Sequence, residues 1–487
     1  MRILKRLSRP VDLTGGVPWR VILQYAAPIM LSYLLQQIYV LTDTVICGQV
    51  LLAEQVAGVN DTFPLTFFFL QFAFGCTAGF SVLTAKYVGA KEDAGVRRSL
   101  VTQGYLTVGI SLLLTLLSLV SLPWLLHLLS LGPENPVVYD AAYQYCFVIF
   151  LGIFAQMGYN LVCGVLRALG DSVSPLLFLL VSTALNVGLD LFFLIPLSMG
   201  PIGAALATVL AQLLSLCGCL VYTFVKYPAL RPNAKDFAPQ WAEIKVHLFA
   251  GVPLGFQFSI LAIGIIVMQS GVVRFDIGAG GVMVAATPAQ NGFGAANKLI
   301  NFLMAFFNGL GSAMLCYTAQ NYGKGNRDRV RRGTLQSLLI MLVICALCVG
   351  AGLALSVGGR YQYIFMSAEK ITPASVHYGN LLLYVDLSMY FILGFLLVVR
   401  SAVQGVLQSG YVLGAGIAEL IARVAICAFL PPLFAGGALG CDAPAIAFVA
   451  LCAGDPGAWL AGSLVLLVPF FRTILCGEEK KTKCRAK

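Results

Sequence analysis

Apolar runs long enough to cross a membrane recur along the whole chain, and they constrain the fold more than any other feature. A membrane helix needs about 20 apolar residues, because its backbone amides must all be paired within the bilayer. Hydrophobic residues make up 59% of the 487 residues and charged residues 11%, against about 25% charged residues in a soluble domain. The alternating pattern of a membrane β-barrel is absent. We therefore expect an all-α integral membrane protein.

The apolar runs predict about twelve transmembrane helices. The expected ranges are 17–47, 53–80, 95–122, 137–163, 173–196, 200–226, 245–272, 284–318, 332–357, 373–400, 408–431 and 444–472. The basic start MRILKRLSRP is not followed by a signal-peptide cleavage site, so we expect it to remain as a tail.

Lys and Arg gather in the segments that share one side of the membrane in this topology. These segments are 86–98, 225–237, 322–332 and the end EEKKTKCRAK. The positive-inside rule then places both termini in the cytoplasm of a multi-pass cell (inner or plasma) membrane protein. The net charge of +10 is a topology signal and an attraction to anionic lipid, and it does not indicate nucleic-acid binding.

The two halves of the chain repeat. AKYVGAKEDAGVRRSL, from Ala85, matches AQNYGKGNRDRVRRGTL, from Ala319, in its Ala, Gly and Val-Arg-Arg. An even number of spans per half predicts two pseudo-symmetric six-helix lobes around a central cleft. The expected organisation is a cytoplasmic tail at 1–16, an N-terminal lobe at 17–226, a cytoplasmic linker at 227–244, a C-terminal lobe at 245–472 and a cytoplasmic basic tail at 473–487.

Little in the sequence points to catalysis, a metal or a cofactor. The fourteen cysteines are scattered singly in apolar segments, and Cys345 and Cys348 have no His or charged neighbour. His127, His247 and His377 form no ligand pair. The glycine-rich stretch from Gly278 follows no strand, which argues against a nucleotide site. We expect no enzyme activity, no metal and no cofactor.

Two polar residues interrupt an apolar span in LNVGLDLFFLI, which runs from Leu185. Asn186 and Asp190 are four residues apart and therefore share one face of a helix. A charge at the bilayer centre costs at least ~3 kcal/mol, so such a residue usually faces a cavity, a partner or a transported ion. The alternative is a purely structural hydrogen-bonded pair.

Several stretches resemble the multidrug and toxic compound extrusion (MATE) transporters of the bacterial type, in the right order over nearly the whole chain. They are YAAPIMLSYLLQQIYVLTDTVICG, GFSVLTAKYVGAKE, GVLRALGDSVSP, LNVGLDLFFLI and PIGAALATVLAQ. The second half fits more loosely. The resemblance implies twelve helices in two lobes, and secondary active antiport of organic cations, drugs or metabolites against H⁺ or Na⁺.

The resemblance assigns a cation-coupling site in the amino-terminal lobe and a hinge in the first span. The coupling residues are Asp43, Asn186, Asp190 and Thr208, and the hinge is Pro28. Two carboxylates and two neutral oxygens suit Na⁺, and they also suit a shared proton, so the ion and its stoichiometry stay open. Asp43 could instead be a solvated group near the outer face, and Pro28 a static kink.

A central cleft would be lined by aromatic and amphipathic residues, each of which could equally be helix packing. The candidates are Tyr33, Gln36, Tyr39, Phe68, Met157, Asn160, Gln257, Met268, Asn297 and Asp386. Glu419 and Arg423 are spaced as a structural helical ion pair. One branch of the family has a Glu in the seventh span, where this chain has Gln257 and Ser259. We therefore expect coupling in the amino-terminal lobe alone.

Two other functions are alternatives for a protein of this class. A lipid-linked oligosaccharide flippase of the same superfamily would need several cations in the cleft, and the spans offer few beyond Arg167, Lys298, Arg400 and Arg423. A membrane-embedded enzyme would need a clustered nucleophile, base or metal set. The expected partners are a small cationic or amphipathic substrate and membrane lipid, with no nucleic acid, and the expected state is a monomer.

Overall fold

The computed structural model describes residues 10–129, 131–132, 135–278, 281–437 and 439–477. Most of the predicted amino-terminal tail and most of the basic carboxyl-terminal tail therefore lie outside the described residues. The described chain is helical throughout, apart from short loops and one isolated bridge between Ile277 and Met283. The prediction of an all-α membrane protein is confirmed.

The described residues of the first half form eight α-helices. They are α2 (Pro18–Val50), α3 (Ala53–Asp61), α4 (Phe63–Ala90), α5 (Asp93–Leu128), α6 (Pro136–Leu151), α7 (Ile153–Ala168), α8 (Val173–Leu194) and α9 (Gly200–Lys226). Two short 3-10 turns follow, η1 (Pro228–Leu230) and η2 (Ala234–Phe237). The predicted linker 227–244 is thus shorter than expected, because α10 already begins at Trp241.

The second half repeats this helical pattern. It contains α10 (Trp241–Arg274), α11 (Pro288–Gly323), α12 (Arg327–Ser356), η3 (Val357–Gly359), α13 (Gln362–Phe365), η4 (Ala368–Lys370), α14 (Pro373–Ser388), α15 (Tyr390–Gly405), α16 (Ser409–Ala435), α17 (Ala445–Cys452), α18 (Gly454–Pro469) and η5 (Phe470–Leu475). Among the described residues, ten helices are long and apolar enough to cross a membrane, or up to twelve if each bent pair is one span.

Several predicted spans are broken within their length, and the hydropathy pattern does not predict these breaks. The expected span 53–80 is divided into α3 and α4 at Thr62, where Pro64 cannot donate a backbone hydrogen bond and begins a new helix. The chain bends by 45° between α6 and α7 and by 53° between α14 and α15. Apolar length predicts that a span exists, but it does not predict a bend within the span.

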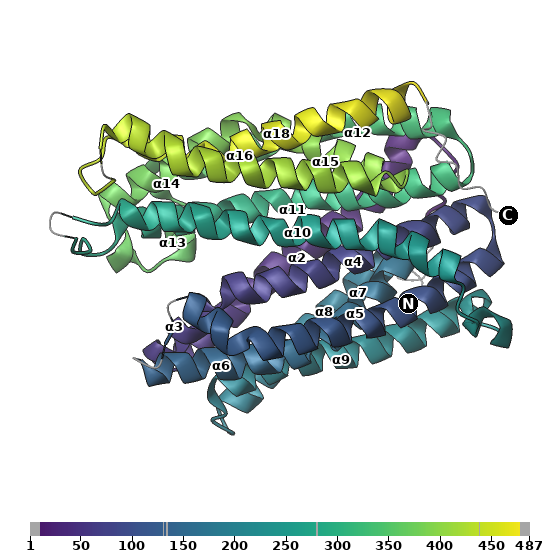
Figure 1. The fold of residues 1–487 in the computed structure, drawn as a ribbon, viewed down its shortest axis with the longest axis horizontal. Helices are drawn as coiled ribbons and strands as arrows, with labels where there is room; N and C mark the ends of the chain where they lie inside the picture. The colour runs from purple at the N-terminus through teal and green to yellow at the C-terminus, as the bar shows by residue number, and fades with distance from the viewer. Residues whose placement is uncertain (1–9, 130, 133–134, 279–280, 438, 478–487) are drawn as a thin grey trace.

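The halves lie side by side, with the purple and blue helices of the first half on one side and the teal to yellow helices of the second half on the other (Figure 1). Helix α4 packs against α10 and α11, and α2 packs against α11. Glycines make the close contact possible: a Cβ added at Gly79 of α4 would lie 2.5 Å from the Ala250 carbonyl oxygen of α10. Small residues let membrane helices approach at backbone distance.

Both described ends of the chain lie at one end of the bundle, which we call the terminal end. Leu13 is hydrogen-bonded there to Asn321, and Gly477 to Arg327. The loop between α10 and α11 lies at the opposite end, which we call the far end (Figure 1). Figure 1 shows the two halves spreading apart toward the far end.

Candidate ion-coupling site in the first half

Helices α2, α8 and α9 bring together the four residues assigned by resemblance to a cation site. Helix α8 packs against α9 and against α2. Asn186 and Asp190 lie one turn apart on α8 and are 1% and 0% exposed. Asp43 comes from α2 and Thr208 from α9. The four-residue spacing therefore turns both polar side chains of α8 inward, away from lipid.

The Asp43 and Asp190 carboxyl groups interact directly with each other. Among the described residues, no basic side chain forms an ion pair with either of them. Both oxygens of Asp190 and Oδ1 of Asp43 are buried without a hydrogen bond from the described chain. Buried polar atoms are nearly always paired, so this concentration of unpaired oxygens requires an explanation. Two adjacent carboxylates repel each other unless a proton or a cation joins them.

Neutral oxygens complete the cluster. The Asn186 amide nitrogen donates to Thr208 Oγ1 at 3.4 Å, and the Tyr39 hydroxyl lies 3.5 Å from the same Oγ1. This contact fixes the amide and leaves Asn186 Oδ1 without a partner. Carboxylate, amide and hydroxyl oxygens are ligands that hard cations accept, and the carboxyl pair can also share a proton.

Two residues at this cluster were not predicted as part of it. Tyr145 of α6 is an electrostatic neighbour of Asp43 and Tyr39, and Cys47 of α2 neighbours both carboxyl groups. Tyr145 sits in the ordinary aromatic run VVYDAAYQYC, which contains no motif. Only the packing of α6 on α9, which the sequence pattern does not reveal, places it there.

Pro28 lies in the part of α2 that packs on the second half, ahead of the point where α2 changes its packing partners. Ile22, Tyr25 and Ile29 belong to the hydrophobic core of the second half, whereas Cys47 packs with α8 and α9 of the first half. The Ser32 hydroxyl donates to the Pro28 carbonyl at 2.9 Å. Proline also removes one backbone hydrogen bond from α2 at this position.

The predicted cleft residues fall into two groups. Tyr33, Tyr39, Phe68, Asn160 and Asn297 are half-buried, and Gln36 is exposed. Met157 is 0% and Met268 4% exposed, each inside a hydrophobic core. These two methionines therefore pack in hydrophobic cores here, and their assignment to a cleft wall stays a prediction. An unbranched apolar side chain fills core gaps equally well, and sequence alone does not distinguish the two uses.

Gln257 and Asp386 also lie inside the second half rather than on a surface. Each is 1% exposed. Gln257 packs against Gly416 of α16, and both of its amide atoms lack a hydrogen-bond partner among the described residues. Asp386 is electrostatically coupled to Asp455 and Arg423. Neither side chain presents surface to a cleft in this conformation.

The predicted ion pair between Glu419 and Arg423 is wrong in its partners. Arg400 Nη2 pairs with Glu419, and Arg423 Nη2 lies 2.6 Å from Asp455 Oδ1. Helical spacing places Glu419 and Arg423 one turn apart on α16. Their ion-pair partners come instead from α15, for Glu419, and from α18, for Arg423. Buried charges need such partners because isolated ions are costly to desolvate. Two of the four interior cations that could have held a pyrophosphate are therefore neutralised by carboxylates.

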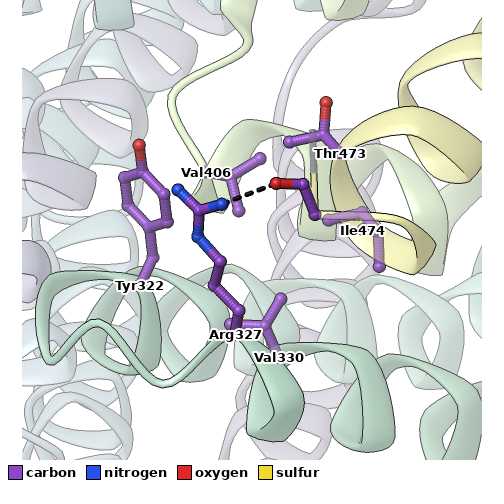
Figure 2. Close-up of a pocket in the computed structure, with 7 residues that line it drawn as sticks. Tyr322, Arg327, Val330, Val406, Thr473 and Ile474 are labelled. Carbon is purple, nitrogen blue, oxygen red and sulfur yellow. Dashed lines mark hydrogen bonds between the residues drawn. The ribbon is translucent and has the colours of Figure 1, made fainter. Parts of the chain in front are cut away.

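A small pocket lies at the terminal end, away from this cluster. It is about 310 Å³ in volume and is lined by Tyr322, Arg327, Val330, Val406, Thr473, Ile474 and Gly477. Figure 2 shows the Arg327 side chain crossing it, with Nη1 donating to the Gly477 carbonyl oxygen at 2.5 Å. Asp43 lies about 37 Å along α2 from the helix start, at 1.5 Å per residue. The pocket and the carboxyl pair are therefore separate features.

Comparison with known families agrees with the helical architecture and the polar cluster. The family model described as MatE matches residues 28–192 and 289–431, which include both α8 polar residues and most of each half. The chain belongs to the MatE family. It is thus a MATE efflux transporter, and the resemblance in the sequence is confirmed.

Curated relatives are similar in sequence, and a solved structure has the same fold. The chain is 29% identical over 321 residues to the probable multidrug resistance protein YpnP of Bacillus subtilis, covering 66% of this chain and 68% of that one. It is 26% identical over 335 residues to a FAD transporter of Shewanella oneidensis, covering 66% and 70%. An outward-facing structure of a multidrug resistance MATE family transporter matches with a TM-score of 0.82 and 22% identity, over 95% and 98% of the two chains. The structural match concerns the fold alone.

Proposed function

We propose that this MATE protein is a secondary antiporter that exports small organic molecules in exchange for H⁺ or Na⁺, with Asp43, Asn186, Asp190 and Thr208 as the coupling site. The observation that carries the proposal is the pair of interacting carboxyl groups of Asp43 and Asp190. Their buried oxygens lack hydrogen-bond partners in the described chain. A passing ion supplies the missing positive charge. A proton is the preferred ion, because two carboxyl groups in contact hold one between them.

Alternating access would follow from a difference in ion affinity between two arrangements of the halves. An empty site keeps two like charges together, which favours an arrangement in which water or substrate separates them. Neutralising the pair lets α2 and α8 close together and expels the substrate. An ion can shift the population only by as much as its affinities for the two arrangements differ.

Pro28 is suited to the hinge role because α2 packs on both halves. Its first turns lie in the core of the second half and its last turns against α8 and α9. When the halves move relative to each other, α2 has to bend because it packs on both. A helix bends at lower cost at Pro28, where it lacks one backbone hydrogen bond.

The substrate is proposed as a cationic or amphipathic organic molecule. The relatives' names cover both multidrug resistance and FAD transport, so substrate chemistry varies among proteins similar to this one. The distribution of Lys and Arg supports a cell membrane location with both termini in the cytoplasm. The protein is expected to act as a monomer without a cofactor. A pyrophosphate-binding flippase is not favoured, because Arg400 and Arg423 are already paired.

The experiment uses inverted membrane vesicles that are acidified inside. Adding a cationic dye should dissipate the pH gradient when wild-type protein is present, and Asp190→Asn should abolish this response. Asp140→Asn is the matched control, because Asp140 is an exposed acid at the start of α6. Dissipation by Asp190→Asn at the wild-type rate would refute the coupling site. Transport that begins only when Na⁺ is added would replace H⁺ by Na⁺.

A further inference from the structure

Residues 11–17, which we call the strap, run between the two halves at the terminal end before α2 begins. The Val11 amide donates to the Gly170 carbonyl oxygen at 3.0 Å, in the loop that leads into α8 of the first half. Two residues later, Leu13 is fully buried in the hydrophobic core of the second half. The strap therefore contacts both halves within three residues.

Arg329 at the start of α12 holds the strap from the second half. Its Nη1 donates to the Gly16 carbonyl oxygen at 2.6 Å, its Nη2 to the carbonyl of Gly15, and its Nε and Nη2 to that of Leu13 at 3.4 and 3.3 Å. One guanidinium group thus donates to the carbonyl oxygens of Leu13, Gly15 and Gly16. This geometry requires the planar, five-donor head of arginine, because a lysine ammonium is a single point with three donors.

Further contacts fix the strap to the same half. The buried Asn321 amide donates to Leu13 O at 3.0 Å, Lys324 Nζ donates to Thr14 Oγ1 at 3.2 Å, and the Trp19 amide donates to Gln336 at 2.9 Å. Asn321 is 0% exposed, and without the strap its amide nitrogen would keep only the Tyr317 carbonyl as an acceptor. Such a loss is costly for a buried group.

The contact with the first half is equally specific. Gly170 has a φ of +86°, and a Cβ added there would collide with the Val11 carbonyl oxygen. Glycine alone allows both the left-handed backbone and the close approach of the strap. Asp171, next along the chain, is held by Ser174 and Lys226, so this loop is a firm anchor.

We infer that the strap is a latch that keeps the halves together at the terminal end, and that Arg329 is the residue that positions it. Both helices that carry the coupling carboxyls, α2 and α8, begin next to the strap. Any arrangement that opens the terminal end must release either the Gly170 contact or the Arg329 contact. The inference rests on the alternating access proposed above, but its test needs neither an ion gradient nor a substrate.

A native cysteine reports on the closure. Cys316 of α11 is 4% exposed and lies next to Tyr25 of α2, between the halves near the terminal end. Cys345 is 5% exposed but lies within the core of the second half, where its thiol faces the Tyr390 carbonyl. Opening the terminal end should expose Cys316 and leave Cys345 buried.

The experiment measures labelling by a water-soluble maleimide, resolved by peptide, on the full protein in lipid nanodiscs. Arg329→Gln should raise the labelling rate of Cys316 at least ~10-fold, since several hydrogen bonds from a charged donor are lost. It should also raise amide exchange in residues 11–19 and leave Cys345 unchanged. Arg331→Gln is the matched control, because Arg331 is exposed two residues later, on the opposite face of α12. Arg329→Lys should give an intermediate rate.

Three outcomes overturn the latch. If amide exchange rises in the strap while Cys316 labelling does not, the strap is bound but does not hold the halves together. If Cys345 labelling rises with that of Cys316, the substitution loosens the whole second half. If neither Cys316 nor the strap responds, Arg329 does not position the strap. None of these outcomes bears on ion coupling, so failure of the latch and failure of the antiport proposal are distinguishable.

Discussion

The carboxyl groups of Asp43 and Asp190 interact in the interior of the first half, although one belongs to α2 and the other to α8. No basic side chain in the described part of the chain pairs with them. A protein keeps such an arrangement at a cost in stability, because both groups are desolvated and of like charge. The same arrangement is what would make the first half responsive to an ion.

Removing one of the two charges should therefore stabilise the protein while it abolishes export. Asp43→Asn and Asp190→Asn should each raise the melting temperature in detergent at pH 8 by about 1 to 4 °C, since repulsion in the pair is relieved. Asp140→Asn should leave the melting temperature unchanged. A fall in melting temperature for both amide variants would mean that the carboxylates are structural partners.

Replacing Pro28 by Ala should slow transport more than it weakens binding. Alanine restores the backbone donor to the carbonyl of Gln24 and stiffens α2 at this position. Turnover should fall about 5- to 10-fold while substrate affinity at low ion concentration changes less than about 2-fold. Transport in proteoliposomes and equilibrium binding to purified protein measure the two effects. Lost binding with unchanged turnover would place Pro28 in a pocket wall instead.

The contact between Gly89 of α4 and Gln320 of α11 should be required to close the terminal end. A Cβ on Gly89 would collide with the Gln320 carbonyl oxygen, which is backbone and has no room to move aside. Gly89→Ala should destabilise the closed arrangement by about 1 to 3 kcal/mol and raise maleimide labelling of Cys316. Gly104→Ala is the control, because nothing lies within 4 Å of its added Cβ. Equal labelling in the two variants would contradict this packing argument.

The strap should be insensitive to pH over the range in which transport is measured. Hydrogen bonds from Thr14 and then the charges of Lys324 and Arg329 lower the pKa of Asp12 below 3.8. A lowered folded-state pKa means that the ionised group stabilises the strap above its unfolded pKa, and that this contribution is lost as the pH falls through the folded pKa. Amide exchange in residues 11–19, corrected for intrinsic rates, should be flat from about pH 8 to 5. Asp12→Asn should remove any further loss of protection below about pH 4.

If protection of the strap changes between about pH 5 and 8, a group other than Asp12 controls it. If it stays flat, a pH dependence of transport in that range has to arise from groups outside the strap.

The spans were predictable because membrane crossing imposes a minimum apolar length, and the length of each apolar run can be counted in the sequence. The bends between α6 and α7 and between α14 and α15 were not, since a bent pair and a straight helix have the same apolar length. Thr62 and Pro64 give a local signal for the break before α4, but the apolar pattern continues across it.

The candidate site was predictable only in part. The spacing of Asn186 and Asp190 identifies one polar face of α8, whereas Asp43 and Thr208 entered through family resemblance. The partners of Arg423 and Glu419 could not be found from helical spacing, because α18 and α15 meet α16 only in the folded protein. The strap could not be predicted, since most of its hydrogen bonds are made by backbone groups, which every residue carries.

The divided packing of α2 also fixes the order in which the protein is built. Helix α2 is synthesised before α11, yet Ile22, Tyr25 and Ile29 have their native neighbours in a core shared with α11, which follows more than two hundred residues later. Until α11 has been inserted, the first turns of α2 and the strap have no native contacts with it. The two halves therefore do not fold independently, one after the other. The strap and the first turns of α2 reach their native packing only after α11 has been inserted.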